Sequence, residues 1–283
     1  MHPLITVDEL AARLGEPGGP VVLDVRWSLL GPPGRQDYER GHLPGAVFVD
    51  LDTELAAPPG PGGRHPLPGA GELQRVLRRA GVRSDRTVVA YDANDGSAAA
   101  RAWWLLRWAG HRDVRVLDGG YDAWVEQGEP VTTEVPEPTE TGFDVVPGSM
   151  PVVDEQGAAW LAREGRLLDA RAPQRYRGET EPVDPRAGHI PGAVNVPFAH
   201  NVTAGGRWKS PAELAERFRN SGVDADSAVG VYCGSGVTAC SNLLALEHAG
   251  LSGPDNPAAL YSGSWSHWSA DPERPAATGP EPG

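Results

Sequence analysis

The chain has 283 residues, and its 38 acidic residues outnumber its 25 lysines and arginines, which gives a formal net charge of −13 at pH 7. This length accommodates two domains with full-sized cores. The acidic balance argues against nucleic acid or an anionic membrane as a partner, because both bind basic surfaces. No apolar stretch approaches the ~20 residues of a membrane span. The first ten residues lack the basic-then-apolar order of a signal peptide.

Cysteine usage points to a reducing compartment. The sequence holds two cysteines, Cys233 and Cys240, which lie seven residues apart on one predicted loop and helix. Such a pair is poorly placed for a disulfide, and with no second pair it does not form a structural zinc site. We therefore expect a cytoplasmic protein that needs neither a metal nor a cofactor.

The first half of the chain alternates short β-branched runs with segments of helical periodicity. The runs are 21–25, 46–49, 87–91 and 114–117, and the helical segments are 73–80 and 98–109. This alternation predicts an α/β fold in which a mainly parallel sheet is flanked by helices.

The second half repeats landmarks of the first in the same order. The matching segments are 23–26 with 168–171, 41–47 with 188–194, 89–92 with 230–233, and 119–124 with 263–268. Their similar offsets indicate a duplicated domain, and a period this long excludes a solenoid. We expect one domain over 1–130, a Pro-, Thr- and Glu-rich linker over 131–150, a second domain over 151–270, and a disordered tail over 271–283.

The segment around Cys233 has the pattern of a nucleophile loop. Residues 228–232 read as a short buried strand, Gly234 and Gly236 allow a tight turn, and 237–249 has helical spacing. Backbone N–H groups and the positive end of a helix dipole would then converge on the thiol and hold it as thiolate, the reactive form. A buried structural cysteine is the alternative, but such a residue needs no glycine cradle.

Together, the duplicated Gly-His-(Leu/Ile)-Pro-Gly-Ala element, the Asp-x-Arg segments and the cysteine loop resemble a tandem rhodanese-domain sulfurtransferase. The loop 233–238, Cys-Gly-Ser-Gly-Val-Thr, is similar to that of the 3-mercaptopyruvate branch. The resemblance implies two tandem rhodanese-like domains and a Cys233 persulfide that carries sulfur from 3-mercaptopyruvate to cyanide, thiols or thioredoxin. Thiosulfate as the donor, or both donors, is the alternative.

The resemblance also implies the residues that bind the donor. Arg175 matches the family's substrate arginine, and Arg186 is the candidate for the second one. The alternative for Arg175 is a surface salt bridge, and that for Arg186 is a surface arginine. The loop residues that follow the nucleophile would complete the binding site: Gly234, Gly236, Val237 and Thr238.

A proton relay is the third implication of the resemblance. Ser235 would act with His65 and Asp52, which match the family's histidine and aspartate from the first half. A carboxylate that orients an imidazole is sound chemistry for proton transfer. The alternatives are a turn serine and a solvated loop histidine.

The repeat shows which residues are structural. Asp92 occupies the position of Cys233 in the first half, and a carboxylate cannot carry sulfane sulfur, so the loop 92–97 is interpreted as structural. His42 and His189 belong to the repeated turn in both halves, and we expect them to hydrogen-bond the backbone there.

Two other functional classes remain to be weighed. A cysteine phosphatase or arsenate reductase needs Cys-x5-Arg, whereas Ala239 stands where that arginine would be. A non-catalytic persulfide carrier stays open, although Arg175 and Ser235 favour an enzyme. We expect a monomer or weak dimer with small-molecule substrates.

Overall fold

The structure is a computed structural model that describes residues 2–93, 95–224, 226–253 and 256–283. The chain divides into two compact units. The first comprises Met1–Ala57, Pro68–Ser149 and Val202–Trp208, and the second comprises Pro58–Leu67, Met150–Asn201 and Lys209–Gly283. Each unit therefore includes a short segment from the other half of the sequence, which the repeat did not indicate. The boundaries predicted from sequence stay predictions.

The first unit contains a parallel sheet with the strand order β1-β5-β4-β2-β3 among its described residues. Its strands are β1 (Leu4–Ile5), β2 (Val21–Asp24), β3 (Val47–Phe48), β4 (Val88–Tyr91) and β5 (Val114–Leu117). Its helices are α1 (Val7–Arg13), α2 (Gly34–Arg40), α3 (Leu51–Glu54), α4 (Ala70–Arg79), α5 (Ser97–Trp108) and α6 (Gly120–Glu126).

The second unit repeats this arrangement with the order β6-β10-β9-β7-β8, again all parallel among the described residues. Its strands are β6 (Val152–Val153), β7 (Arg166–Asp169), β8 (Val194–Asn195), β9 (Val229–Tyr232) and β10 (Ala259–Tyr261). Its helices are α7 (Glu155–Glu164), α8 (Pro173–Tyr176), the 3-10 turn η1 (Phe198–Asn201), α9 (Pro211–Asn220), α10 (Ala239–His248) and α11 (Ser264–Trp268). Both sheets confirm the predicted α/β architecture.

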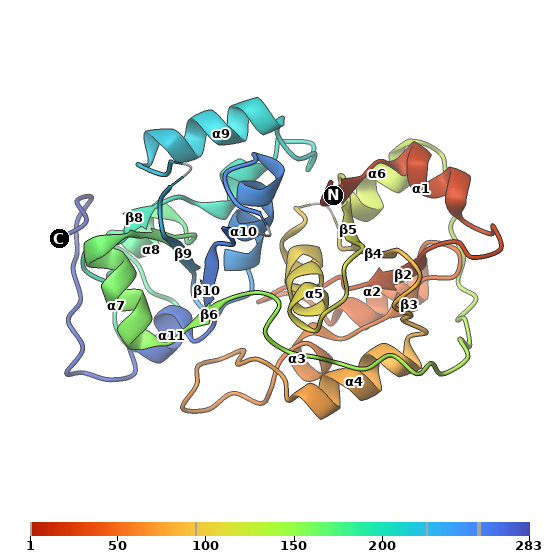
Figure 1. Ribbon diagram of the computed structural model, residues 1–283, viewed down its shortest axis with the longest axis horizontal. Helices are drawn as coiled ribbons and strands as arrows, with labels where there is room; N and C mark the ends of the chain where they lie inside the picture. The colour runs from red at the N-terminus through yellow and green to blue at the C-terminus, as the bar shows by residue number, and fades with distance from the viewer. Residues whose placement is uncertain (1, 94, 225, 254–255) are drawn as a thin grey trace. The chain divides into compact units, whose positions relative to one another are not determined.

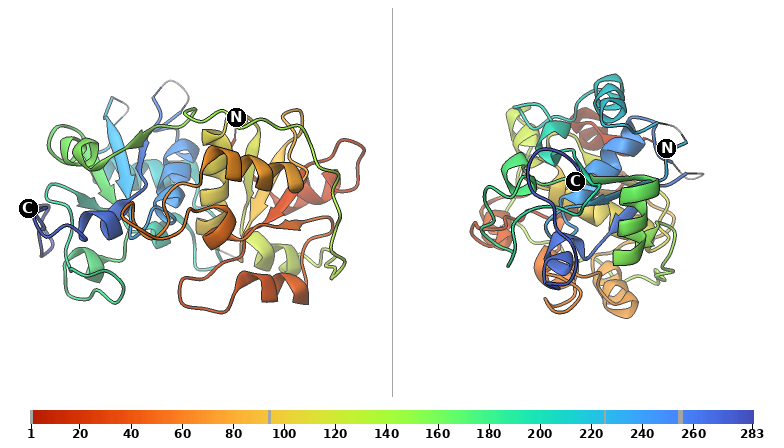
Figure 2. Two further views of the ribbon diagram at one scale, coloured as in Figure 1. Left: turned by 90° about the horizontal axis from the view of Figure 1, so that it is seen from below. Right: turned by 90° about the vertical axis from the view of Figure 1, so that its left-hand side faces the viewer.

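Helices cover both faces of each sheet, and for this reason the middle strands β4 and β9 are buried along their whole length. In the second unit α7 and α11 share one core with β7, built around Leu161, Leu167 and Trp265. Helix α10 packs on β9 and β10 from the other side, as Figures 1 and 2 show. Every residue from Ala239 to Leu246 of α10 is buried, which explains its lack of a polar face.

The histidines of the repeated turn confirm their structural interpretation. His42 Nδ1 lies 2.8 Å from the carbonyl oxygen of Tyr38, and His189 Nδ1 lies 2.8 Å from that of Tyr176. The His42 ring also stacks on the Tyr38 ring, and the His189 ring stacks on the Tyr176 ring, with centroids 3.8 Å and 3.7 Å apart. Both histidines are fully buried, so they support the turn and do not face a substrate.

Residues 271–283 make defined contacts, which do not fit the expected disordered tail. Ala277 pairs with His189 in an antiparallel bridge, and the Trp268 indole donates to the carbonyl of Pro275 at 2.8 Å. Thr132 and Pro130 make the same two contacts with His42 and Trp124 in the first unit. This part of the repeat consists of contacts with backbone groups. Such contacts do not require particular side chains, so the Pro- and Gly-rich sequence does not show them.

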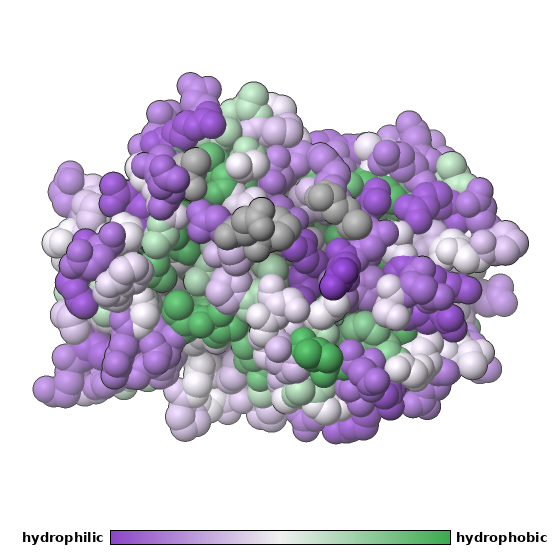
Figure 3. Space-filling view, viewed as in Figure 1, coloured by the Kyte–Doolittle hydropathy of each residue, from purple (hydrophilic) through white to green (hydrophobic). Residues whose placement is uncertain are grey.

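Hydrophilic residues cover most of the face seen in Figure 3, and hydrophobic residues gather there only in small groups. Among the described residues, no helix is both long and apolar enough to cross a membrane.

Candidate active site

The site residues of the second unit come together because parallel strands end at the same edge of a sheet. Cys233 directly follows the central strand β9, and Ser264 lies just beyond its neighbour β10. Helix α8, which carries Arg175, follows β7 on the other side of β9. Residues far apart in sequence therefore surround one thiol.

Cys233 is held in the predicted backbone cradle. Its side chain is buried, with 2% of the residue exposed, and its Sγ accepts the N–H of Gly236 at 3.1 Å. Gly236 has φ +82°, and a Cβ there would lie 2.5 Å from the carbonyl oxygen of Ser262. Only glycine fits this position, and it aims a backbone donor at the sulfur.

Ser264 also holds the nucleophile, and the sequence analysis did not identify it. Its buried hydroxyl donates to the carbonyl of Tyr261 at 2.9 Å and accepts the N–H of Cys233 at 3.1 Å. Its φ of +53° is the one positive value for a residue other than glycine among the described residues. Gly120 takes the matching position in the first half with φ +58°. The serine that replaces a glycine at this position of the repeat is the sequence feature that could have identified Ser264.

The first unit shows what this type of loop binds. The carboxylate of Asp92 accepts the backbone N–H groups of Gly96, Ala98 and Ala99 at 3.0, 3.0 and 3.1 Å. The loop follows β4 and leads into α5, as the Cys233 loop follows β9 and leads into α10. The amides of the first loop therefore converge on the two oxygens of one carboxyl group. This agrees with the structural interpretation of that loop, although its Asn94 lies outside the described residues.

The structure brings His65 and Ser235 together. His65 Nδ1 lies 2.7 Å from Ser235 Oγ, and the two residues are 8% and 5% exposed. An unprotonated Nδ1 can accept the serine O–H, so the pair can pass a proton. Asp52 lies in α3 of the first unit, where it accepts the indole N–H of Trp27 at 2.9 Å. Its part in a relay stays a prediction.

Arg175 lies beside the cysteine loop in a network of buried acids. A Cβ at Gly234 would lie 3.4 Å from its Nη1. Its Nη2 pairs with Glu181 at 2.5 Å and with Asp184 at 3.0 Å. Glu181 also lies 3.5 Å from the buried Arg171. Two carboxylates thus orient the guanidinium beside Gly234, the residue that follows the nucleophile.

Arg186 lies against the C-terminal segment. Its two terminal nitrogens donate to the carbonyls of Asp271 and Pro272, each at 3.3 Å, and its guanidinium lies 6.0 Å from the ring centre of Trp265. Donor binding by Arg186 stays a prediction, and these contacts do not support it.

Two acids and one arginine of this network were missed by the sequence analysis. They are Glu181, Asp184 and Arg64, and Arg64 forms an ion pair with Asp184. Burial raises the pKa of the Asp184 carboxyl; Arg64 opposes this rise, and the charge of Glu181 adds to it. These residues lie on irregular connections and are not part of the sequence repeat. Their ion pairs in the structure identify them as part of the site.

The remaining predicted site residues belong to the start of helix α10. Val237 is buried, and its carbonyl accepts the N–H of Cys240 at 3.0 Å, while Thr238 is the N-cap. Their contact with a donor stays a prediction. The Cys240 Sγ donates to the carbonyl of Gly236 at 3.3 Å, so the Cys240 thiol helps to hold the backbone of the cysteine loop.

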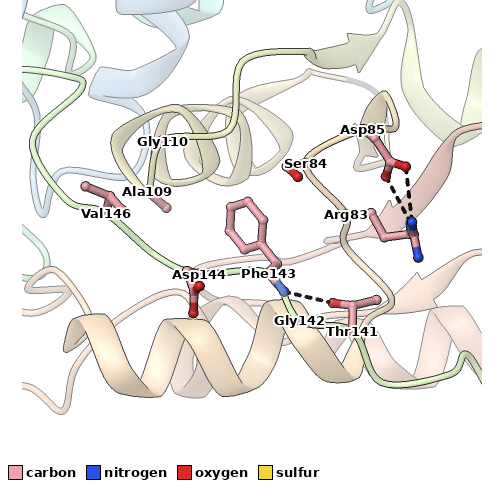
Figure 4. Close-up of a pocket in the computed structure, with 10 residues that line it drawn as sticks. All are labelled: Arg83, Ser84, Asp85, Ala109, Gly110, Thr141, Gly142, Phe143, Asp144 and Val146. Carbon is pink, nitrogen blue, oxygen red and sulfur yellow. Dashed lines mark hydrogen bonds and ion pairs between the residues drawn. The ribbon is translucent and has the colours of Figure 1, made fainter.

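A separate pocket of about 570 Å³ lies in the first unit (Figure 4). Figure 4 shows the Phe143 ring between Ala109 and Ser84, and the Arg83–Asp85 ion pair at one end. No cysteine or histidine is among its described lining residues. Its chemistry therefore offers no counterpart to the thiol of the second unit.

Comparison with known proteins gives a consistent result. Residues 6–127 and 154–271 each match the family described as "Rhodanese-like domain". The chain is 47% identical over 284 residues to the "Probable 3-mercaptopyruvate sulfurtransferase" of Pseudomonas aeruginosa, covering 98% of each chain. It is 44% identical to the "Putative thiosulfate sulfurtransferase SseB" of Mycobacterium tuberculosis, covering 98% of this chain and 97% of the relative.

Among solved structures, the chain is similar to the crystal structure of SseA from Escherichia coli, described as a 3-mercaptopyruvate sulfotransferase with the rhodanese fold. The TM-score is 0.82 at 33% sequence identity, with 94% of this chain and 100% of the other covered.

Proposed function

The chain belongs to the family of proteins with rhodanese-like domains, and on this basis we propose that it is a sulfurtransferase that moves sulfane sulfur from 3-mercaptopyruvate to a thiophilic acceptor. The observation that carries this proposal is the Cys233 thiol, which accepts the Gly236 N–H in a loop whose Gly234 lies beside the Arg175 guanidinium. The similarity to the Pseudomonas relative and to SseA supports the choice of donor.

The first half-reaction transfers one sulfur atom to the enzyme. The Cys233 thiolate attacks the sulfur of HS–CH₂–CO–COO⁻, an S–S bond forms, and the donor C–S bond breaks. Its electron pair leaves as the enolate of pyruvate. The enolate takes up one proton and the new persulfide releases one, so the products are Cys233–S–S⁻ and pyruvate.

The neighbouring residues have distinct roles in this step. Arg175 binds the donor carboxylate, because its planar fork matches both oxygens. Ser235 and His65 carry the proton that the enolate needs. The loop amides stabilise the terminal sulfur anion, as the corresponding loop in the first unit holds the carboxylate of Asp92.

The second half-reaction returns the enzyme to its starting form. An acceptor nucleophile attacks the outer sulfur, the S–S bond breaks, and the Cys233 thiolate leaves. With cyanide the product is thiocyanate. Thiols and reduced thioredoxin are the acceptors that we propose in a cell, and the cytoplasm is the compartment in which two buried thiols stay reduced.

Thiosulfate is the second candidate donor, and the similarity to SseB favours it. It carries two negative charges, and the site already contains the carboxylates of Glu181 and Asp184. These acids offset two of the three arginines of the network, Arg64, Arg171 and Arg175, so the remaining positive charge suits a monoanion better than a dianion. We therefore propose 3-mercaptopyruvate as the preferred donor. We also propose that the protein is a monomer or weak dimer.

A steady-state assay with each donor and cyanide, combined with intact-protein mass spectrometry, tests the function. We expect sustained thiocyanate release, a higher kcat/KM for 3-mercaptopyruvate, and a mass gain of one sulfur atom on Cys233. Cys233→Ser should abolish the adduct and turnover, whereas Cys240→Ser should keep the adduct on Cys233. A single turnover would identify a persulfide carrier instead, and no adduct with either donor would refute the proposal.

A further inference from the structure

The segment Pro58–Leu67, which we call the arm, belongs to the second unit although it lies in the first half of the sequence. Gly60 and Gly63 pair with each other through both of their backbone groups, at 3.1 and 3.0 Å, so the arm makes a tight turn. Gly63 has φ +107°, and a Cβ there would lie 2.8 Å from both the Gly263 carbonyl oxygen and the Ser266 hydroxyl oxygen. Only a glycine lets the arm lie this close to the start of α11.

Ser266, on α11, joins the arm to the cysteine loop. Its hydroxyl accepts the N–H of Arg64 at 3.1 Å and donates to the carbonyl oxygen of Gly263 at 3.0 Å. Its own N–H donates to the carbonyl oxygen of Gly234 at 2.9 Å. The residue is buried, so these hydrogen bonds lie away from water, where they are stronger. One serine thus ties two segments that are far apart in the sequence.

The two residues that Ser266 ties directly precede the proton-transfer pair. Arg64 is followed by His65, and Gly234 is followed by Ser235. His65 Nδ1 and Ser235 Oγ lie 2.7 Å apart. Because each peptide unit is planar and rigid, a shift of the arm at Arg64 is passed on to His65. The hydrogen bonds of Ser266 therefore set the distance between His65 and Ser235.

The repeat shows which part of this arrangement distinguishes the half with the nucleophile. Asp122 occupies the position of Ser266 in the first half, and its N–H donates to the carbonyl oxygen of Ala93 at 2.9 Å, as that of Ser266 donates to Gly234. This backbone bond is therefore common to both halves. The side chains differ, because Asp122 is exposed, whereas Ser266 is buried and uses its hydroxyl both as donor and as acceptor.

We propose that Ser266 is a positioning residue for sulfur transfer, which holds the arm so that His65 stays within hydrogen-bond distance of Ser235. This inference rests on the proposed function, in which His65 and Ser235 carry the proton that the pyruvate enolate needs. Ser266 acts through His65 and has no part of its own in the chemistry. Its loss should therefore slow the step that needs this proton and spare the others.

The two candidate donors make different demands on the His65–Ser235 pair. Release of pyruvate from 3-mercaptopyruvate requires a proton for the enolate. Thiosulfate transfers its outer sulfur to the Cys233 thiolate as its S–S bond breaks, and the electron pair leaves on sulfite, which needs no proton. Loading from thiosulfate therefore reports on the cysteine loop alone, whereas loading from 3-mercaptopyruvate also reports on the proton-transfer pair.

Stopped-flow loading of Cys233 in the full-length protein tests the inference. Ser266→Ala removes the acceptor of the Arg64 N–H, so loading from 3-mercaptopyruvate should slow roughly tenfold or more, while loading from thiosulfate should stay close to the wild-type rate. Ser269→Ala is the matched control, because Ser269 is buried at the end of the same helix and its hydroxyl has no hydrogen-bond partner among the described residues. This control should load from both donors at the wild-type rate. Equal losses with both donors in Ser266→Ala, or no loss with 3-mercaptopyruvate, would overturn the inference.

A double variant checks that Ser266 acts through the imidazole. With 3-mercaptopyruvate, Ser266→Ala should add little to the loss that His65→Ala already causes. A further loss as large as in the wild-type background would mean that Ser266 acts elsewhere. That result would overturn the inference even if the wild type accepts no sulfur from thiosulfate.

The same contact can be disturbed from the arm. Gly63→Ala places a Cβ 2.8 Å from the Ser266 hydroxyl oxygen, so the arm must move, and loading from 3-mercaptopyruvate should again slow more than loading from thiosulfate. Gly62→Ala is the control on the same arm, since its Cβ would meet only the Pro66 ring at 3.6 Å, an ordinary contact. These variants carry the test if Ser266→Ala does not fold, and equal rates for Gly63→Ala and Gly62→Ala would contradict the inference.

NMR of protein with isotope-labelled histidine rings supplies a readout that needs no donor. The Nδ1 resonance of His65, assigned by its absence from His65→Ala, should move in Ser266→Ala in the same direction as in Ser235→Ala, which deletes the hydrogen-bond donor. It should stay in place in Ser269→Ala. A resonance that is unchanged in Ser266→Ala would overturn the inference. A protein that shows the expected shifts but takes up sulfur from neither donor would refute the proposed function alone.

Discussion

The hydroxyl of Ser264 accepts the backbone N–H of Cys233 at 3.1 Å, and the serine holds a φ of +53° to do so. A left-handed conformation costs a residue with a Cβ about 1–2 kcal/mol. The hydrogen bond offsets part of this cost and keeps the amide of the nucleophile in place. In the first half, where no nucleophile is present, glycine adopts the same conformation without strain.

Replacing Ser264 separates the hydrogen bond from the strain. Ser264→Ala keeps the strain and leaves the buried Cys233 N–H without its acceptor, so the free energy of unfolding should fall by about 1–3 kcal/mol. Ser264→Gly also removes the acceptor but relieves the strain, so its loss should be smaller. Both should lower kcat roughly tenfold or more, because the thiol is displaced. Urea unfolding and steady-state rates measure this, and an unchanged kcat in both variants would show that Ser264 serves the fold only.

The glycine of the cradle tests the role of the backbone donor. Gly236→Ala places a Cβ about 2.5 Å from the Ser262 carbonyl oxygen at φ +82°. We expect a loss of about 2 kcal/mol or more in stability and a strong fall in sulfur loading. Gly250→Ala is the control, since it has φ +70° but open space around its Cβ position. This variant should lose only the stability that the backbone strain costs, and mass spectrometry should show the same sulfur loading as in the wild type.

His65 and Ser235 should act as one unit in proton transfer. Each alanine variant is expected to lower kcat with 3-mercaptopyruvate on the order of 100-fold, and the double variant should lose little more than either single one. Stopped-flow loading of Cys233 isolates the donor half-reaction. Additive losses, or an unchanged rate in His65→Ala, would make the 2.7 Å contact structural.

Asp92 should make stability depend on pH. Burial, together with the charge of Asp95, raises the pKa of Asp92 to about 7 in the folded chain, above the value near 3.9 of an unfolded chain. Folding then favours the protonated form, so this contribution is complete below about pH 4 and is lost as the pH rises through about 7. The loss should be on the order of 4 kcal/mol.

Urea unfolding of the wild type and of Asp92→Asn at several pH values measures this effect. The variant should be less stable at low pH, because an amide accepts N–H groups through one oxygen only, but its stability should vary less between pH 4 and pH 8. Asp95→Asn should move the wild-type transition to lower pH. A wild-type stability that rises from pH 4 to pH 8 would contradict the expected sign.

The sequence by itself determined the features that depend on local pattern and repetition. Alternating strands and helices, the duplicated landmarks and the glycines beside Cys233 predicted the α/β fold and the nucleophile loop. The same patterns placed His65 with Ser235 through resemblance, and the structure brings their side chains within hydrogen-bond distance. Turn conformation and strand burial depend mainly on residues that are close together in the sequence, so a single sequence is enough to predict them.

Only the tertiary structure decided which charges meet at the thiol. Arg64 and Asp184 are 120 positions apart on irregular connections, and their pairing leaves no periodic mark. The ordered contacts of residues 271–283 and the Ser264 support of Cys233 likewise depend on carbonyl and hydroxyl groups meeting across the fold. Such contacts form where the carboxyl ends of parallel strands converge, and that convergence exists only once the chain has folded.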